Sequence, residues 1–137
     1  MIVFDQKIKS TFELVAATVD QITALLQEKY QLDKAVIFRI SFMLREIINN
    51  AVEHGNQFDE EKFIHIIVEV DENNMNFKVQ DQGNGFTLQI LEQVPDHYLR
   101  VRNRGIFLIK EFGFEIEVIG QVVQVQMHLP YEVNSIY

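Results

Sequence analysis

Residues 46–55 read EIINNAVEHG and end a long, predominantly apolar segment of the chain. Glu46, Asn50 and His54 follow one another at intervals of four residues. Each step of four turns the direction around a helix by only about 40°, so these three polar side chains are expected to lie along one stripe. The residues between them are mostly isoleucine, alanine and valine, which are typical of a buried helix face. The segment therefore predicts a central helix with a polar stripe at the border of the core.

Capping signals define this helix and one before it. Asp33 is a typical N-cap residue for the central helix, and Gly55 is expected to end it in a left-handed cap. Upstream, Ser10 and Glu13 form the S-x-x-E pattern of a capping box. That pattern precedes apolar residues at helical spacing, which predicts an earlier helix ending near Tyr30.

Around the helices the apolar pattern changes to the alternation typical of β-strands. Strands are predicted at 1–8, 63–70, 75–79, 115–119 and 122–129, and a third helix at 106–112. The segment 71–74 and the pair Gly120-Gln121 are hairpin turns. Residues 81–103 carry no strong pattern and are expected to form a lid or binding loop, mobile without ligand over 87–103. The chain, 1–137, is interpreted as one α+β domain with helices on one face of an antiparallel-rich sheet.

Composition excludes several classes of function. The chain has 137 residues, of which 47% are hydrophobic, and this fits one globular domain. A net charge of -8 argues against a nucleic-acid partner, which would call for a basic surface. The absence of cysteine excludes disulfides and thiolate metal sites and fits a cytoplasmic location. We find no apolar run of the ~18 residues that a membrane span needs.

The polar stripe requires partners because it borders the core. A carboxylate and an amide buried alone would each cost about 1–3 kcal/mol or more. Mg²⁺ is one suitable partner for the amide oxygen of Asn50, because it prefers hard oxygen ligands and keeps phosphates and water as the rest. Glu46 would then be free to deprotonate a water or hydroxyl. The alternative is a helix-edge hydrogen-bond network or a solvated polar face.

Two further stretches suit a phosphorylated ligand. Residues 81–85 read DQGNG directly after a strand, where glycine permits close approach and Asp81 can accept hydrogen bonds from a ligand amine. Residues 100–109 read RVRNRGIFLI, so basic residues precede a predicted helix start at Gly105, a natural anion site. An ordinary D-x-G turn and a solvated basic loop are the alternatives. No Walker A or dinucleotide motif is present.

Taken together in this order, the three stretches resemble the GHKL superfamily of ATP-binding proteins, named for gyrase, the heat-shock chaperone, histidine kinases and MutL. Residues 46–55 resemble its N box, 81–86 its first glycine box and 104–109 its second. The first strand, the S-x-x-E start and the form of the N box are similar to bacterial anti-sigma factor serine kinases. The resemblance implies a Bergerat-type two-layer α/β sandwich, with a mixed, mostly antiparallel sheet, three helices on one face and an ATP lid.

The resemblance also implies roles for individual residues, with ATP and Mg²⁺ as cofactors. Asn50 would bind Mg²⁺, and Glu46 would be the general base that prepares the attacking hydroxyl. Asp81 would accept a hydrogen bond from the adenine amino group. The other residues implied to contact the nucleotide are His54, Gly83, Gly85, Phe86, Arg104, Gly105 and Ile106.

The implied activity is that of a protein-serine kinase acting as an anti-sigma factor or partner switch. Its partners would be a small antagonist (anti-anti-sigma-like) protein and a sigma factor, and homodimerisation is expected from the family. Two departures stand out: Asn103 where the second glycine box usually has glycine, and Val122-Val123 where a threonine is common. We also expect no room for the dimerising phosphoacceptor domain of a histidine kinase. A nucleotide-binding interaction module without transfer, or an ATPase of another branch, is the alternative.

Overall fold

The computed structural model describes residues 1–83 and 100–129, without the side chains of 100–104. Most of the predicted lid, 81–103, therefore lies outside the described residues. The elements in chain order are β1 (Ile2–Lys9), α1 (Phe12–Tyr30), α2 (Lys34–Asn50), η1 (Ala51–Gly55), β2 (Phe63–Val70), β3 (Asn74–Gln80), α4 (Arg100–Glu111), β4 (Glu115–Ile119) and β5 (Val122–His128). The predicted bounds of β2 and β4 are confirmed; β5 differs from the prediction by one residue at one end, and β1 and β3 differ by one residue at both ends.

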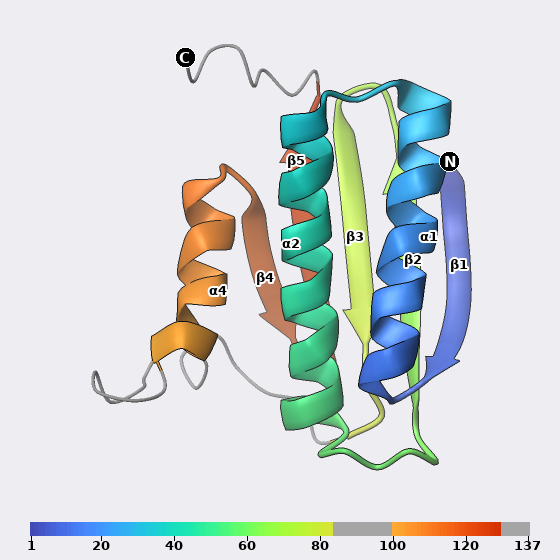
Figure 1. Ribbon diagram of the computed structural model, residues 1–137, viewed down its shortest axis with the longest axis vertical. Coiled ribbons are helices and arrows are strands. Elements are labelled where there is room, and N and C mark those ends of the chain that lie inside the picture. The colour runs from blue at the N-terminus through green and yellow to red at the C-terminus, as the bar shows by residue number, and fades with distance from the viewer. Residues whose placement is uncertain (84–99, 130–137) are drawn as a thin grey trace.

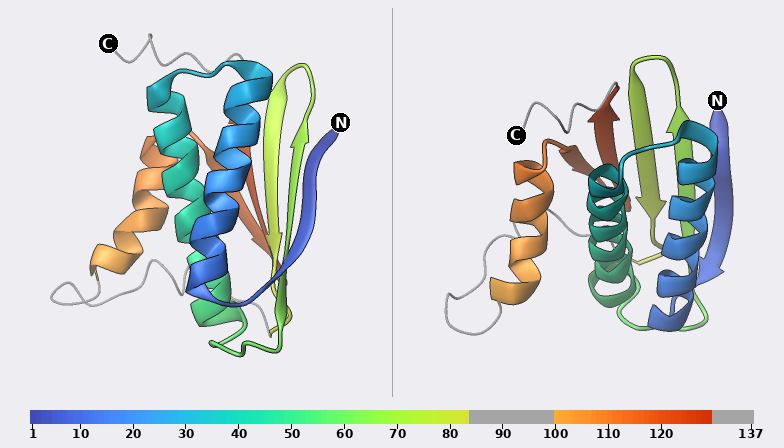
Figure 2. Two further views of the ribbon diagram at one scale, coloured as in Figure 1. Left: turned by 45° about the vertical axis from the view of Figure 1, so that its right-hand side comes forward. Right: turned by 45° about the horizontal axis from the view of Figure 1, so that its top comes forward.

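The strands form one five-stranded sheet in the order β1-β2-β3-β5-β4. Its pairings are antiparallel throughout, so the described sheet lacks the parallel pair that a mixed sheet would have. Helices α1, α2 and α4 lie on the same face of the sheet, with α2 between the other two (Figure 1). Figure 2 shows the same two layers from two further directions. The predicted α+β sandwich is therefore confirmed.

The core lies between the sheet and the helices. Alternate residues of β2, β3 and β5 point to this face, as the period of two requires, and the most buried of them are Ile64, Ile66, Val68, Met75, Phe77, Val79, Val125 and Met127. Helix α2 contributes Ile40, Met43, Leu44, Ile47 and Ile48, each at most 1% exposed. Burying one such side chain contributes about 1.5–3 kcal/mol, so the middle strands and α2 hold the sandwich together.

The first helix starts one residue away from the predicted position. Its N-cap is Thr11, whose hydroxyl accepts a hydrogen bond from the backbone N–H of Leu14 at 3.3 Å. The predicted cap, Ser10, is unavailable because its N–H donates to the Lys62 carbonyl at 3.1 Å and so continues the pairing of β1 with β2. The capping-box prediction at Ser10 and Glu13 is wrong for this reason. Asp33 does stand at the N-cap of α2.

The end of α2 also differs from the prediction. The helix continues without a break into η1, a single π-helical turn in which the Asn56 N–H donates to the Ala51 carbonyl at 2.8 Å. Gly55 does not have positive φ, so the predicted left-handed cap is wrong. The chain turns two residues later, where Gln57 and Phe58 have φ of 53° and 62°.

Helix α4 begins at Arg100 rather than at the predicted Ile106. Gly105 therefore lies inside this helix and not at its start. Helix α4 packs along α2, and the Phe42 and Phe112 rings meet edge to face with centroids 5.7 Å apart. None of the described helices is both long enough and apolar enough to span a membrane.

Candidate functional site

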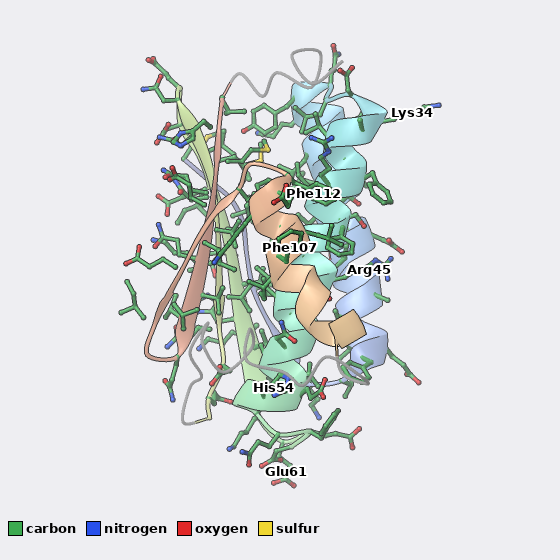
Figure 3. The ribbon with its side chains drawn as sticks, turned by 90° about the vertical axis from the view of Figure 1, so that its left-hand side faces the viewer. Lys34, Arg45, His54, Glu61, Phe107 and Phe112 are labelled. Atoms are coloured by element: carbon green, nitrogen blue, oxygen red, sulfur yellow. The ribbon has the colours of Figure 1, made fainter. Side chains whose placement is uncertain are left out.

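The polar stripe runs down the last turns of α2 into η1. Asn50 is only 3% exposed, so its amide lies within the packed layer between helix and sheet. His54 is half-buried, and its burial lowers the pKa of its imidazole. Its Nε2 atom lies 4.0 Å from Oε1 of Glu53. In Figure 3, His54 lies at the end of this segment, below α4.

The turn after β3 holds Asp81 in a defined position. The side chain is 2% exposed, and its Oδ1 accepts a hydrogen bond from the Gly83 N–H at 2.8 Å. The Asp81 N–H donates to the Gln121 carbonyl at 3.1 Å, and the Gln121 side-chain amide donates to the Gly83 carbonyl. Burial raises the pKa of the Asp81 carboxyl, partly offset by the Gly83 hydrogen bond and the charge of Lys62. The turn therefore presents a buried carboxylate whose charged form is costly.

Two glycines bring this turn against η1. A Cβ added at Gly55 would overlap the carboxylate of Asp81, and one added at Gly83 would overlap the carbonyl oxygen of Gly55. Only residues without a side chain allow this approach of two backbones. The predicted meeting of the first and second stretches is thus a direct backbone contact.

Asn56 links the same two segments, and the sequence analysis missed it. It is 0% exposed, its Oδ1 accepts from the Gln82 N–H at 2.7 Å, and its Nδ2 donates to the Phe63 carbonyl at 3.1 Å. Gln82 in turn accepts from the Phe63 N–H at 2.5 Å. The available signal was an amide residue directly after the predicted helix end, a position where side chains commonly bond to backbone.

The third stretch meets the first at Glu46. A Cβ added at Gly105 would overlap the Glu46 side chain, so this glycine allows α4 to lie close to α2. The predicted anion site at Gly105 and Ile106 needs free helical N–H groups, which belong to the first turn of a helix. That turn begins at Arg100, and Ile106 is buried in the core at 1% exposure. Placing the helix-start anion site at Gly105 is therefore wrong.

Some of the predicted residues are brought together and some cannot be placed. Glu46 meets Gly105, and Asp81 with Gly83 meets Gly55, while Asn50 lies between these two contacts on the same helix. Gly85 and Phe86 lie outside the described residues, and of Arg104 only the backbone within α4 is described.

A model of the histidine kinase-like ATPase domain matches residues 8–129, which is most of the chain. The chain belongs to this family. No curated protein sequence is significantly similar to this histidine kinase-like ATPase domain.

Solved structures share its fold at low sequence identity. The Erythrobacter litoralis EL346 blue-light activated histidine kinase aligns with a TM-score of 0.59 at 14% identity, over 88% of this chain and 43% of that one. A histidine kinase domain from the same protein aligns with a TM-score of 0.49 at 13% identity, over 86% of this chain and 61% of that one. The histidine kinase-like ATPase domain thus spans less than half the length of the full kinase.

The donor set of this domain fits a magnesium nucleotide better than a metal held by protein alone. Among the described residues, no group of three or more His, Asp or Glu side chains could hold a metal ion. Asn50 offers one neutral oxygen, and Mg²⁺ commonly takes one or two protein oxygens and completes its shell with phosphates and water. A divalent ion here would therefore arrive with a phosphorylated ligand.

Proposed function

We propose that this domain binds ATP with Mg²⁺ and transfers the γ-phosphoryl group to a serine of a small partner protein, as a partner-switch kinase of the anti-sigma type. The observation that carries the proposal is that one segment, residues 46–55, contacts both other stretches. It meets Gly105 of α4 at Glu46 and the turn at Asp81 through Gly55. A nucleotide held along residues 46–55 would reach the central segment, the Asp81 turn and α4.

Each residue has a role that its surroundings support. The Asp81 carboxylate accepts a hydrogen bond from the amino group of adenine, in a turn held by Gln121 and Asn56. Asn50 would supply one oxygen to Mg²⁺, and the ion would offset the negative charge of the phosphates. Because both side chains are buried, their positions are set by packing before the nucleotide arrives.

Glu46 favours a hydroxyl as the acceptor. A serine hydroxyl is a weak nucleophile that needs an adjacent base, whereas a neutral imidazole already carries a free lone pair. In the proposed step the Glu46 carboxylate takes the hydroxyl proton, the serine oxygen bonds to the γ-phosphorus, and the bond to the β–γ bridging oxygen breaks. ADP leaves and the partner becomes a phosphoserine protein.

One observation favours a second candidate, a nucleotide-binding module that transfers nothing. Gly105 lies against the Glu46 side chain, so in this arrangement α4 covers the proposed base. Phosphoryl transfer requires α4 to move away from Glu46. If α4 stays in place, the domain would bind ATP and a partner protein without transferring the phosphoryl group.

The partners belong to the proposal as well. We propose that a small antagonist protein carries the serine that accepts the phosphoryl group and that a sigma factor is the protein sequestered. We propose that the active form is a homodimer in the cytoplasm. The charge of -8 supports protein rather than nucleic-acid partners.

The test uses γ-labelled ATP, purified candidate antagonist proteins and two variants with matched controls. Asn50→Ala should abolish Mg²⁺-dependent ATP binding, while Asn49→Ala should bind normally. Glu46→Gln should bind ATP and lose transfer by about 10²–10⁴-fold, the range for a general base, while Glu28→Gln on the exposed side of α1 should transfer normally.

The outcomes separate the candidates. Label on a partner serine that is lost in Glu46→Gln supports the kinase. Tight ATP binding with no label on any partner supports the binding module. Unchanged ATP affinity of Asn50→Ala in Mg²⁺ would remove Asn50 as the metal ligand.

A further inference from the structure

A solvent-exposed aromatic pair lies at the end of the molecule where α1 begins. Phe12 is 46% exposed and Phe58 is 55% exposed, and their rings meet edge to face with centroids 5.7 Å apart. Figures 1 and 2 show the start of α1 beside the loop that follows η1. Their contact joins the two rings into one contiguous apolar surface, and contiguous apolar surface, unlike singly exposed side chains, is typical of interaction sites. We call Phe12 and Phe58 the aromatic pair.

The aromatic pair borders a hollow of about 360 Å³. The hollow is lined by Ser10, Thr11, Phe12, Glu13, Val52, Phe58 and Glu60. Its floor is apolar at Val52, which is 1% exposed and belongs to the core. A single aromatic or branched aliphatic side chain fits such a hollow beside the two rings.

The backbone holds Phe58 in place at a conformational cost. Gln57 and Phe58 are consecutive residues with φ of 53° and 62°, a region that residues with a Cβ rarely adopt. The Phe58 N–H donates to the Val52 carbonyl at 2.8 Å, which ties this conformation to η1. This conformation turns the chain after η1 and at the same time holds the Phe58 ring at the surface, and backbone strain of this kind clusters at functional sites.

The charge around the aromatic pair selects the partner. Among the described residues that line the hollow, Glu13 and Glu60 are acidic and none is basic. The same loop adds Asp59 and Glu61, and Figure 3 shows Glu61 at the end of the molecule beyond His54. Lys62, in the same loop, is not among the residues that line the hollow. An acidic rim around an apolar hollow attracts a basic segment and orients it.

We propose that the aromatic pair and its hollow form a docking site for a partner-protein segment in which an aromatic or aliphatic side chain is flanked by lysine or arginine. The apolar side chain enters the hollow and packs beside Phe12 and Phe58, and the basic side chains meet Glu13 and Glu60. The site goes beyond the proposed phosphoryl transfer, since docking here needs no nucleotide. Val52 of η1 lines the hollow and Gly55 of η1 contacts Asp81, so a bound segment and a bound nucleotide would share one structural element.

The test titrates the full ¹⁵N-labelled chain with three synthetic peptides, KKLFKK, EELFEE and KKSSKK. Addition of KKLFKK should shift the amide signals of Phe12, Glu13, Phe58 and Glu60. The affinity for this peptide should fall as the salt concentration is raised. Phe58→Asn removes the ring while keeping a residue that tolerates positive φ, and it should weaken binding at least ~10-fold, as expected for an aromatic anchor. Phe38→Asn, at another exposed phenylalanine on α2, is the matched control and should bind like the wild type. Thermal melts confirm that both variants fold.

Several results would overturn the proposal. Equal binding of EELFEE and KKLFKK would remove the charge selection, and equal binding of KKSSKK would remove the apolar anchor. Equal loss in Phe38→Asn would show that the site lies elsewhere. Concentration-dependent self-association that Phe58→Asn abolishes would assign the surface to a second copy of the chain. Asp81→Asn separates the two functions: it should lose ATP and keep the peptide.

Discussion

Replacing Gly83 with alanine tests the contact that joins the Asp81 turn to η1. The new methyl group would overlap the carbonyl oxygen of Gly55, and that oxygen belongs to backbone that cannot rotate away. Overpacking of this kind costs about 1–3 kcal/mol. Moving the turn would also disturb the hydrogen bonds from Gly83 N–H to Asp81 and from Gln121 to the Gly83 carbonyl, each worth about 0.5–1.5 kcal/mol. We expect a loss of about 2–6 kcal/mol in the free energy of unfolding.

Urea denaturation followed by circular dichroism measures this loss, and fluorescent ATP analogue titration measures the accompanying loss of nucleotide affinity. Gly120→Asn is the control: an added Cβ there meets nothing within 4 Å, and asparagine tolerates its φ of 60°. The control should stay within about 0.5 kcal/mol of the wild type, as surface changes usually do. If Gly83→Ala were as stable as this control, the close contact between the two glycines would be refuted.

Two further variants address the same turn. Asp81→Asn should be at least as stable as the wild type at pH 7, because burial raises the Asp81 pKa and the folded state carries the cost of its charge. That cost disappears as the pH falls through the raised pKa, so the stability advantage of the variant should shrink on acidification. Urea titrations from pH 7 to pH 4 would show this trend. The ATP affinity of the variant should be reduced at every pH. Asn56→Ala should lose about 1–3 kcal/mol in the same assay, because it removes two part-buried hydrogen bonds, to the Gln82 N–H and to the Phe63 carbonyl. A loss below about 0.5 kcal/mol would show that these groups find water instead.

The regular elements could be predicted because their signals are local. The alternation in β2 and the apolar spacing in α2 arise from which face of each element is buried, and the structure places both faces as predicted. The start of α1 could not be predicted, because the strand pairing of Ser10 with Lys62 decides it from a distance of many residues. Helix propensity likewise gave no sign that α4 would reach back to Arg100.

The candidate site was predictable as three stretches and not as a set of contacts. Residues 46–55 and Asp81 were recognised from polar groups and glycines in unusual positions. The reasons for those glycines differ from the predicted ones: Gly55 and Gly105 serve close packing, against Asp81 and Glu46, rather than a cap and an anion site. Such pairings join residues far apart in the chain, and a single sequence contains no direct signal of them.

The π-turn in η1 makes the length of this segment matter more than its composition. Its hydrogen bond from Asn56 to Ala51 spans five residues where an α-helix would span four. Removing one residue between Ala51 and His54 would let an ordinary helix continue, and every later side chain would then rotate by about 100° around the axis. Gly55 would turn away from Asp81 even though each local residue type was kept, so a single deletion in this segment should break the contact as surely as a side chain added at Gly55.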